Sequence, residues 1–271
     1  MKPILFHIGN VVFPSYTFMI MIGVLAATWF GLKILKSRGL PVIYGIDMAI
    51  SGIAFGFVGG RIAHVLVEAP LMVPGYYWEK PIRFFYFWQG GFVSWGAYIG
   101  VLLAWYFYLQ WRKQPVWAYF DIASISFPLA MFFGRGGCLL AGCCFGKPTD
   151  FFIHLTFTNP ASTAYSIYPN IPLHATQIYL MANVLLIQLS LWWISRKYWR
   201  FQGELFSLMM ILYPVGRIGI EFLRGDVDRG VYFGGAVSAG QLAMIPFLIA
   251  GIYSYFYFKR LGLPVPQRIT S

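Results

Sequence analysis

The sequence predicts an all-α polytopic membrane protein with seven transmembrane helices. Hydrophobic residues make up 59% of the 271 positions and charged residues only 11%, whereas a soluble domain carries about 25% charged residues. Apolar runs of about 20 residues, the length that crosses a bilayer, recur along the chain. Most of the lysines and arginines lie in the segments between these runs. We therefore expect one transmembrane domain over residues 1–271.

Seven apolar runs are long enough to cross a membrane. The first lacks the small-residue cleavage site of a signal peptide and exceeds the length of its apolar core, so we assign it as the first span. No internal repeat is visible. The expected spans cover residues 13–34, 44–66, 91–110, 121–140, 175–194, 203–222 and 236–258.

The basic residues of the connecting segments predict the orientation. One set of connections holds Lys33, Lys36, Arg38, Arg112, Lys113, Arg196, Lys197, Arg200, Lys259, Arg260 and Arg268. The opposite set holds Lys2, Lys80, Arg83, Lys147, Arg224 and Arg229. Cytoplasmic loops carry the excess of lysine and arginine. We therefore expect the N-terminus outside, the C-terminus inside, and a location in the bacterial cytoplasmic (inner) membrane.

Two outer connections are long, while the inner ones are short. Residues 68–90 are rich in aromatic residues and proline, which suits an interfacial arm lying at the headgroup layer. Residues 141–174 include the β-like run FFIHLTFT and predict a small outer cap between helices 4 and 5. Function is accordingly expected at the outer half of the bundle.

The net charge of +11 does not indicate a nucleic-acid partner. The basic residues are scattered between apolar runs and are not gathered on one face. We expect no nucleic-acid partner and no cofactor.

Four ionisable residues inside the spans are the strongest functional candidates, because such residues are costly in a bilayer and usually functional. Arg61, Arg135 and Arg217 each follow a glycine near the outer end of a span, and Glu221 lies one helical turn after Arg217. A buried ion pair between helices needs only one arginine and one glutamate. Three arginines favour recognition of an anion, and guanidinium groups match phosphate in bidentate geometry. A phospholipid headgroup is the abundant anion at that depth.

Three other polar residues near outer span ends are further candidates. Tyr16 suits either an anchor in the aromatic belt or a polar role in the site. His174 suits a solvated helix start as well as a site residue, and His64, near Arg61, suits packing or a role as a base.

The three cysteines, Cys138, Cys143 and Cys144, have the spacing C-x4-CC. Structural zinc sites usually combine two pairs of ligands, so this spacing disfavours a metal, and we predict none. A disulfide from Cys138 to either neighbour, a thiol activated by Arg135, and close packing of small residues all fit the pattern. We favour packing.

Six stretches together resemble bacterial prolipoprotein diacylglyceryl transferases over nearly the whole chain, as a divergent member. They are SYTFMIMIG (15–23), GGRIAHVLV (59–67), QGGFVSWGAYIG (89–100), GRGGCLLAGCCFG (134–146), LHATQIY (173–179) and YPVGRIGIEFLR (213–224). The resemblance implies transfer of a diacylglyceryl group from phosphatidylglycerol to the lipobox cysteine thiol of a pre-lipoprotein signal peptide, with release of glycerol phosphate. The implied partners are these two substrates and the surrounding membrane lipids.

The resemblance also implies roles for matched residues. Arg135 matches the arginine that holds the lipid phosphate, and Arg217 the one near the scissile ester. Glu221 is then expected to orient Arg217.

Four more matched positions are implied to complete the site. Arg61 and Arg224 are expected to support the phosphate, Tyr16 matches a tyrosine needed for activity, and Gly146 matches the glycine that closes the signature.

The chain departs from the family pattern where polar residues are usual. Cys138 and Cys143 stand at or near positions of asparagine and glutamate, and Trp95 replaces a histidine that is a candidate base for the acceptor thiol. Because tryptophan accepts no proton, His64 and His174 are candidate substitutes. A transferase with a different acceptor and a non-catalytic lipid-binding protein remain alternatives. A transporter is disfavoured, because neither an inverted repeat nor a central carboxylate relay is visible.

Overall fold

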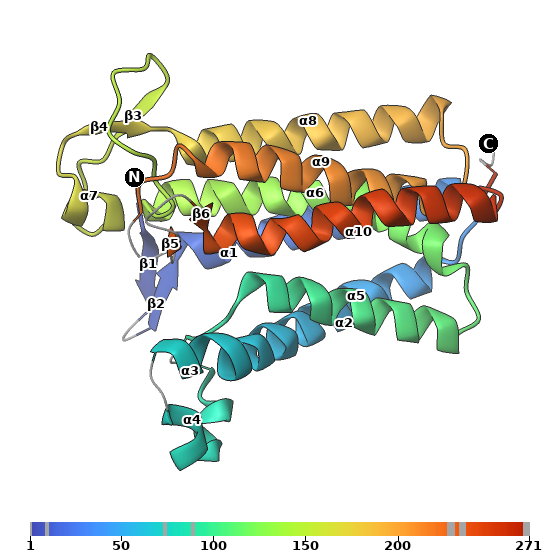
Figure 1. Ribbon diagram of the computed structural model, residues 1–271, viewed down its shortest axis with the longest axis horizontal. Coiled ribbons are helices and arrows are strands. Elements are labelled where there is room, and N and C mark those ends of the chain that lie inside the picture. Colours follow the sequence, from blue (N-terminus) through green and yellow to red (C-terminus); the bar gives the residue numbers. More distant parts are fainter. Residues whose placement is uncertain are drawn as a thin grey trace. The chain divides into compact units, whose positions relative to one another are not determined.

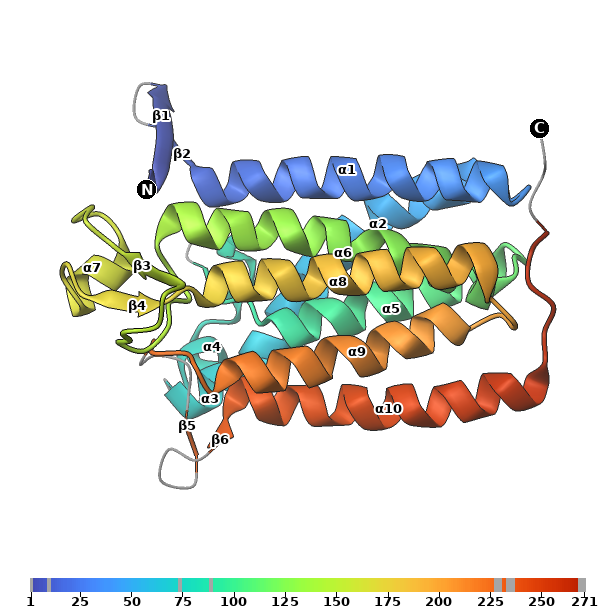
Figure 2. The same cartoon turned by 90° about the horizontal axis from the view of Figure 1, so that it is seen from above.

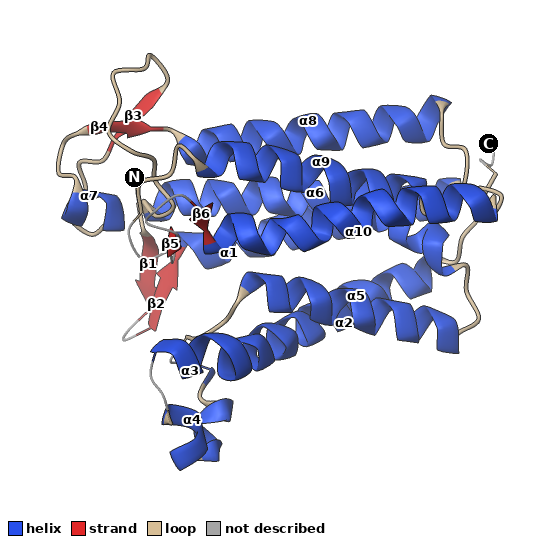
Figure 3. Cartoon of the chain, in the orientation of Figure 1, coloured by secondary structure: helices blue, strands red, loops and turns tan. Residues whose placement is uncertain are grey.

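The computed structural model describes residues 2–8, 11–72, 75–87, 90–226, 231–232 and 237–267. Arg229 and Arg268, which entered the orientation count, lie outside these residues. In the described part, strands form only short two-stranded antiparallel ribbons and the rest of the regular structure is helical (Figure 3). Among the described residues, five helices are long and apolar enough to cross a membrane. The predicted class, an all-α multi-pass membrane protein, is confirmed.

The chain divides into two compact units. Unit 1 comprises Met1–Gly39 and Trp117–Ser271, and unit 2 comprises Leu40–Val116. Each unit is described by itself below.

Unit 1 contains five long helices (Figure 1). They are α1 (Ser15–Ser37), α6 (Val116–Ala141), α8 (Thr176–Lys197), α9 (Glu204–Glu221) and α10 (Ala239–Leu261). On α8 the buried residues Leu180, Val184, Ile187 and Leu191 recur every three or four positions. This spacing places them on one face of the helix, which packs inward while the opposite face stays exposed.

Small residues bring helices of unit 1 close together. A Cβ atom added at Gly23 of α1 would lie 2.9 Å from both the carbonyl oxygen of Ala130 and the Cβ of Phe133. A Cβ added at Gly251 of α10 would lie 2.9 Å from the carbonyl carbon of Met210. Membrane helices associate through such small residues because the contact then involves backbone atoms directly.

A buried carboxylate fastens one end of unit 1. Asp121 accepts hydrogen bonds from the backbone N–H groups of Gly203 (2.6 Å) and Phe206 (2.8 Å) and from the indole of Trp199 (3.2 Å). These donors lie at the start of α9 or just before it. The first N–H groups of a helix lack intrahelical acceptors, so Asp121 supplies an acceptor to the buried backbone N–H groups of Gly203 and Phe206.

Three short ribbons complete the described part of unit 1. They pair β1 (Ile4–Ile8) with β2 (Val11–Pro14), β3 (His154–Thr156) with β4 (Pro172–His174), and β5 (Val231–Tyr232) with β6 (Val237–Ser238). The ribbon β3–β4 and the short helix α7 (Thr163–Ile167) lie together beyond the ends of α6 and α8 (Figure 2). They enclose a small apolar core of Phe145, Phe157, Ala164 and Leu173. Strand pairing within residues 141–174 agrees with the β-like pattern there.

Unit 2 is a helical hairpin with an arm between its helices. Its elements are α2 (Val42–Ala63), η1 (His64–Glu68), α3 (Ala69–Met72), α4 (Tyr76–Glu79), η2 (Pro81–Phe85) and α5 (Ser94–Trp111). A Cβ added at Gly59 would lie 2.5 Å from the carbonyl oxygen of Gly96 and 2.9 Å from the Cα of Gly100. The backbones of α2 and α5 therefore meet at glycine.

The surfaces of the helices suit lipid contact. Leu25, Leu186 and Ile249 are among many large apolar side chains that are more than 60% exposed, and soluble proteins rarely expose extended apolar surfaces. The five apolar helices are α1, α2, α6, α8 and α10. Helices α5 and α9 occupy the other two expected spans. Seven crossings therefore stay a prediction, as does the single-domain assignment.

Candidate functional site

The glycine-rich end of α6 packs against the start of α1. A Cβ atom at Gly137 would lie 3.0 Å from Cδ2 and 3.1 Å from Cα of Tyr16. Tyr16 lies close enough to Arg135 and to all three cysteines to interact with them electrostatically. The glycines of this motif therefore let α1 bring the candidate Tyr16 to the end of α6.

The cysteines lie at the end of α6 and in the turn that follows. Gly142 and Cys144 adopt left-handed φ angles of 70° and 57°, and the backbone N–H of Cys143 donates to the carbonyl oxygen of Cys138 (3.1 Å). All three thiols are free, and their Sγ atoms lie within 4.8 Å of one another. The turn thus closes the C-x4-CC motif into one cluster of sulfur atoms.

Two side chains at the start of α8 hold this turn. The hydroxyl of Thr176 donates to the carbonyl oxygen of Cys144 (2.7 Å), and Nε2 of Gln177 donates to that of Cys143 (2.8 Å). Both side chains are fully buried. The position of the cysteine turn is therefore fixed by α8 as well as by α6.

Arg217 and Glu221 form a buried ion pair on one face of α9. Their side chains are only 10% and 2% exposed. Glu221 also accepts hydrogen bonds from Ser238 Oγ (2.9 Å) and from Arg224 (3.5 Å). Ser238 begins α10 in a capping box with Gln241, so the carboxylate connects α9 to α10. Glu221 holds Arg217 in place, as the sequence pattern predicts for residues four apart on a helix.

Arg224 is neutralised by a residue that the sequence analysis did not single out. Its Nε donates to Oδ1 of Asp226 (2.9 Å) and its Nη2 donates to Oδ2, forming a bidentate pair. Burial, the largest single effect, lowers the pKa of the Arg224 guanidinium, but the hydrogen bonds to Asp226 and the attraction to Cys144 and Asp226 together raise it above its ordinary value. Arg224 is therefore a permanent cation fixed in orientation.

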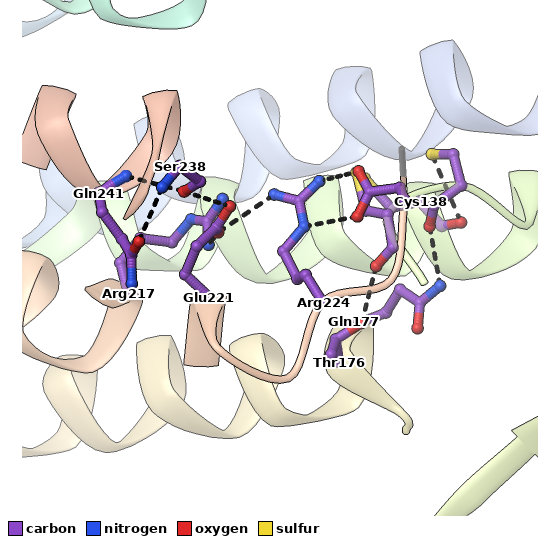
Figure 4. A network of polar contacts seen from close by, with 11 residues as sticks. Cys138, Thr176, Gln177, Arg217, Glu221, Arg224, Ser238 and Gln241 are labelled. Carbon is purple, nitrogen blue, oxygen red and sulfur yellow. Dashed lines mark hydrogen bonds and ion pairs between the residues drawn. The ribbon is translucent and has the colours of Figure 1, made fainter. Parts of the chain in front are cut away.

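The ion network and the cysteine cluster are neighbours. Figure 4 shows Ser238 and Gln241 beside Glu221 and Arg217 at one end, with Cys138, Thr176 and Gln177 at the other and Arg224 between them. Arg135 interacts electrostatically with Arg217, Arg224 and Cys144. Thiol–thiol hydrogen bonds with Cys138 lower the pKa of Cys144, and Arg224 and Arg135 lower it further. Unit 1 thus brings together Tyr16, Arg135, Arg217, Glu221 and Arg224.

Gly146 lies where three backbone segments meet. It forms an isolated bridge with Arg224, the N–H of Gly225 donates to the carbonyl oxygen of Phe145 (3.0 Å), and the N–H of His174 donates to that of Lys147 (2.9 Å). A Cβ atom at Gly146 would overlap the backbone of His174. Glycine is therefore required at position 146 because the backbone of His174 passes too close for a side chain.

His174 belongs to the β3–β4 ribbon. It pairs with His154, its ring packs near Phe151, and its Nδ1 lies 3.5 Å from the hydroxyl of Tyr179. These contacts place the ring among the aromatic residues of the cap.

Arg61 and His64 lie in unit 2. Arg61 is 1% exposed, and its five N–H groups all donate to backbone carbonyl oxygens, those of Arg83, Phe84, Tyr86, Gly90 and Gly91. The ring of His64 packs edge-on against Tyr77, with centroids 5.8 Å apart. Because all of its N–H groups already donate to these carbonyl oxygens, Arg61 is better suited to fixing the arm (residues 68–90) than to holding a phosphate.

Five residues of this network escaped the sequence analysis: Thr176, Gln177, Asp226, Ser238 and Gln241. Ser238 and Gln241 form the S-x-x-Q signature of a capping box, which precedes an apolar run and was available as a signal. Asp226 lies two residues after Arg224 in an outer connection, where an acidic residue is ordinary. Thr176 and Gln177 bind backbone atoms more than 30 residues away, and no local pattern indicates such contacts.

Comparison with known proteins identifies similar sequences across the chain. Residues 3–257 match the family model described as prolipoprotein diacylglyceryl transferase. A protein of Clostridium tetani named phosphatidylglycerol–prolipoprotein diacylglyceryl transferase is 36% identical over 255 residues, covering 94% of this chain and 97% of its own. A second protein of that name, transferase 2 of Clostridium perfringens, is 34% identical and covers 97% of both chains. The transferase of Polynucleobacter necessarius is 28% identical, covering 89% of this chain and 94% of its own.

Proposed function

The chain belongs to the prolipoprotein diacylglyceryl transferase family, and we propose that it transfers the diacylglyceryl group of phosphatidylglycerol to a prolipoprotein. In this proposal the acceptor is the thiol of the lipobox cysteine in the signal peptide. A C–S bond forms at the glyceryl carbon that carries the phosphate, the C–O bond to phosphate breaks, and glycerol phosphate leaves. The protein is a transferase that acts on two membrane-borne substrates.

The buried Arg217–Glu221–Arg224 arrangement carries the proposal. Together with Arg135 and Asp226, these side chains hold three positive and two negative charges, a net charge of +1. Phosphatidylglycerol presents a phosphodiester with one negative charge. Rigid guanidinium groups bind phosphate oxygens in bidentate geometry and stabilise the charge that develops as the C–O bond breaks.

Six of the predicted residues have a role at the lipid phosphate or beside it in this proposal. Arg135 holds the lipid phosphate, Arg217 faces the leaving oxygen, and Glu221 and Arg224 keep the charges in place. Tyr16 lies beside Arg135 and contacts the substrate. Gly146 contributes because it has no side chain and so leaves room for the backbone of the cap at His174.

We place the protein in the bacterial inner membrane, with seven helices crossing, the N-terminus outside and the C-terminus inside. The start of α1 and the end of α10 lie at opposite ends of unit 1, as an odd number of crossings requires (Figure 2), and the distribution of lysine and arginine gives the orientation. Residues 68–90 then form the interfacial arm, which Arg61 secures, and residues 141–174 form the outer cap of a single transmembrane domain.

The test uses purified full-length protein, labelled phosphatidylglycerol and a lipobox peptide, with lipidated peptide and released glycerol phosphate as readouts. Arg135→Lys and Arg217→Lys keep the charge but lose the bidentate fork. Because losing one well-placed donor to a developing charge costs about 100-fold to 1,000-fold in rate, we expect a drop of that size. Arg196→Lys, a change in the last turn of α8, is the matched control and should retain the wild-type rate.

The outcomes separate the alternatives. Lipid binding without release of glycerol phosphate, with the lipobox peptide or with cell extract, would overturn the enzymatic proposal. Release of glycerol phosphate with cell extract but not with the lipobox peptide would indicate a different acceptor. Full activity of both arginine variants would refute the roles assigned to the arginines.

A further inference from the structure

Three sulfur ligands converge at the end of α6, beside the arginines of the proposed site. Cys138, Cys143 and Cys144 each offer one Sγ atom, and these atoms lie within 4.8 Å of one another. Cys138 is buried and the other two are partly exposed. The C-x4-CC spacing does not match a structural zinc site, which has four protein ligands. The fold brings together three sulfur ligands, the number of protein ligands in a catalytic zinc site.

We propose that Cys138, Cys143 and Cys144 bind a Zn²⁺ ion through three thiolates and leave its fourth position open for the thiol of the acceptor peptide. This inference rests on the proposed transferase function and adds the means by which the acceptor sulfur is activated. Zinc sites that act on substrates typically have three protein ligands and one open position. Thiolate ligands favour soft or borderline ions such as Zn²⁺ over Mg²⁺ or Ca²⁺.

The sulfur separations suit such an ion. With Zn–S bonds of about 2.3 Å in tetrahedral geometry, bound sulfur atoms lie about 3.8 Å apart. Separations within 4.8 Å therefore require each sulfur atom to move by less than about 1 Å. Rotation about the cysteine Cα–Cβ bonds supplies movements of this size.

The backbone that carries the ligands is held in place before any ion binds. Cys144 adopts a left-handed φ of 57° in the turn after α6, and its Sγ atom lies within 4.8 Å of those of Cys138 and Cys143. Thr176 and Gln177 of α8 fix the carbonyl groups of Cys144 and Cys143. A preorganised site loses less conformational entropy on binding, which favours a dedicated site over an accidental meeting of thiols.

The charges around the cluster suit an anionic metal complex. Three thiolates and Zn²⁺ carry a net charge of −1. Arg135 and Arg224 interact electrostatically with Cys144, and Arg217 does as well. The same guanidinium groups are assigned to the lipid phosphate, so a metal-bound sulfur nucleophile lies close to the phosphate leaving group.

The chemical step balances without an oxidant or reductant. The acceptor thiol binds the open position and releases its proton to water, because a coordinating thiol is deprotonated outright. Its sulfur then attacks the glyceryl carbon that bears the phosphate oxygen. The C–O bond breaks with its electron pair going to that oxygen, and the thioether product, a weaker ligand than the thiolate, leaves the metal.

The binding test uses Co²⁺ and Zn²⁺ with metal-stripped, reduced, full-length protein. We expect one Co²⁺ per chain with sulfur-to-metal charge-transfer absorption, displaced by Zn²⁺. Changing a residue that only orients a ligand costs about 10-fold to 100-fold in metal affinity, so each Cys→Ser change should cost at least that. Ser166→Ala, an exposed cap residue, is the control.

The transfer test keeps failure of the metal proposal distinct from failure of the proposed function. A chelator should abolish peptide lipidation by the wild type, and Zn²⁺ should restore it. Arg217→Lys should lose transfer yet bind Co²⁺ normally. Cys143→Ser and Cys143→Ala should lose both, and thermal unfolding shows whether each variant is folded.

Three results would overturn the inference. The first is the absence of charge-transfer absorption in the reduced wild type, and the second is a stable disulfide within the cluster of the protein as isolated. The third is chelator-resistant transfer at the wild-type rate. If the wild type transfers nothing yet binds Co²⁺ through its cysteines, the transferase function fails while the metal site stands.

Discussion

Replacing Glu221 with glutamine tests whether the buried carboxylate holds the ion network together. Glu221 is 2% exposed and accepts from Arg217, Arg224 and Ser238. Breaking a buried ion pair by neutralising one partner costs about 3–5 kcal/mol. Because the amide keeps one acceptor oxygen, we expect the lower end, about 3 kcal/mol.

The chain offers a matched control in another Arg–Glu pair with the same spacing. Glu79 is 72% exposed and lies 4.0 Å from Arg83. Exposed pairs of this spacing contribute only about 0.3–0.5 kcal/mol. Glu79→Gln should therefore leave both stability and transfer near the wild-type values.

The assay follows thermal unfolding in detergent micelles by the fluorescence of the ten tryptophans, alongside peptide lipidation. Glu221→Gln should unfold at a lower temperature. It should also transfer about 100-fold more slowly, the effect of displacing a catalytic group by about 1 Å. Equal unfolding temperatures for Glu221→Gln and Glu79→Gln would refute the reasoning.

A double variant separates stability from catalysis. Replacing a buried pair with apolar residues is often neutral or stabilising, because neither charge is left unpaired. Arg217→Leu/Glu221→Leu should therefore recover most of the stability lost in Glu221→Gln, while Arg224 keeps its own partner, Asp226. Transfer should stay lost. A double variant less stable than Glu221→Gln would contradict this account.

Three further predictions concern unit 1. Asp121→Ala leaves two backbone N–H groups, those of Gly203 and Phe206, without their acceptor, at about 1–3 kcal/mol for each unsatisfied donor, and should lower the unfolding temperature markedly. Hydrogen bonding within the cysteine cluster lowers the pKa of Cys144 and raises that of Cys143. In metal-stripped protein, iodoacetamide should therefore modify Cys144 at pH values where Cys143 stays protonated. Peptide mass spectrometry would show which of the two cysteines carries the modification. Gly146→Ala should cost about 1–3 kcal/mol through overpacking and speed proteolysis of the cap, whereas Gly219→Ala, whose Cβ meets open space, should do neither.

The sequence alone was sufficient to predict the class of fold and the charged centre of the candidate site. Long apolar runs indicate transmembrane helices directly, because a segment in the bilayer core must form its backbone hydrogen bonds within itself. Arg135, Arg217 and Glu221 stood out for the same reason, since a charge in an apolar run is costly whatever surrounds it. The four-residue spacing of Arg217 and Glu221 predicts a shared helix face, and they form an ion pair there.

Tertiary structure decided which charges have partners and where the cysteines meet. Arg61 is surrounded by carbonyl oxygens of the arm, although its sequence context matches that of Arg135. Cys138 and Cys144 come within reach of each other because a left-handed turn and two α8 side chains fold the chain back. Helical periodicity and charge are properties of one segment, and the sequence displays them. The pairing of a side chain depends on atoms brought from distant segments by packing, so only the folded chain determines it.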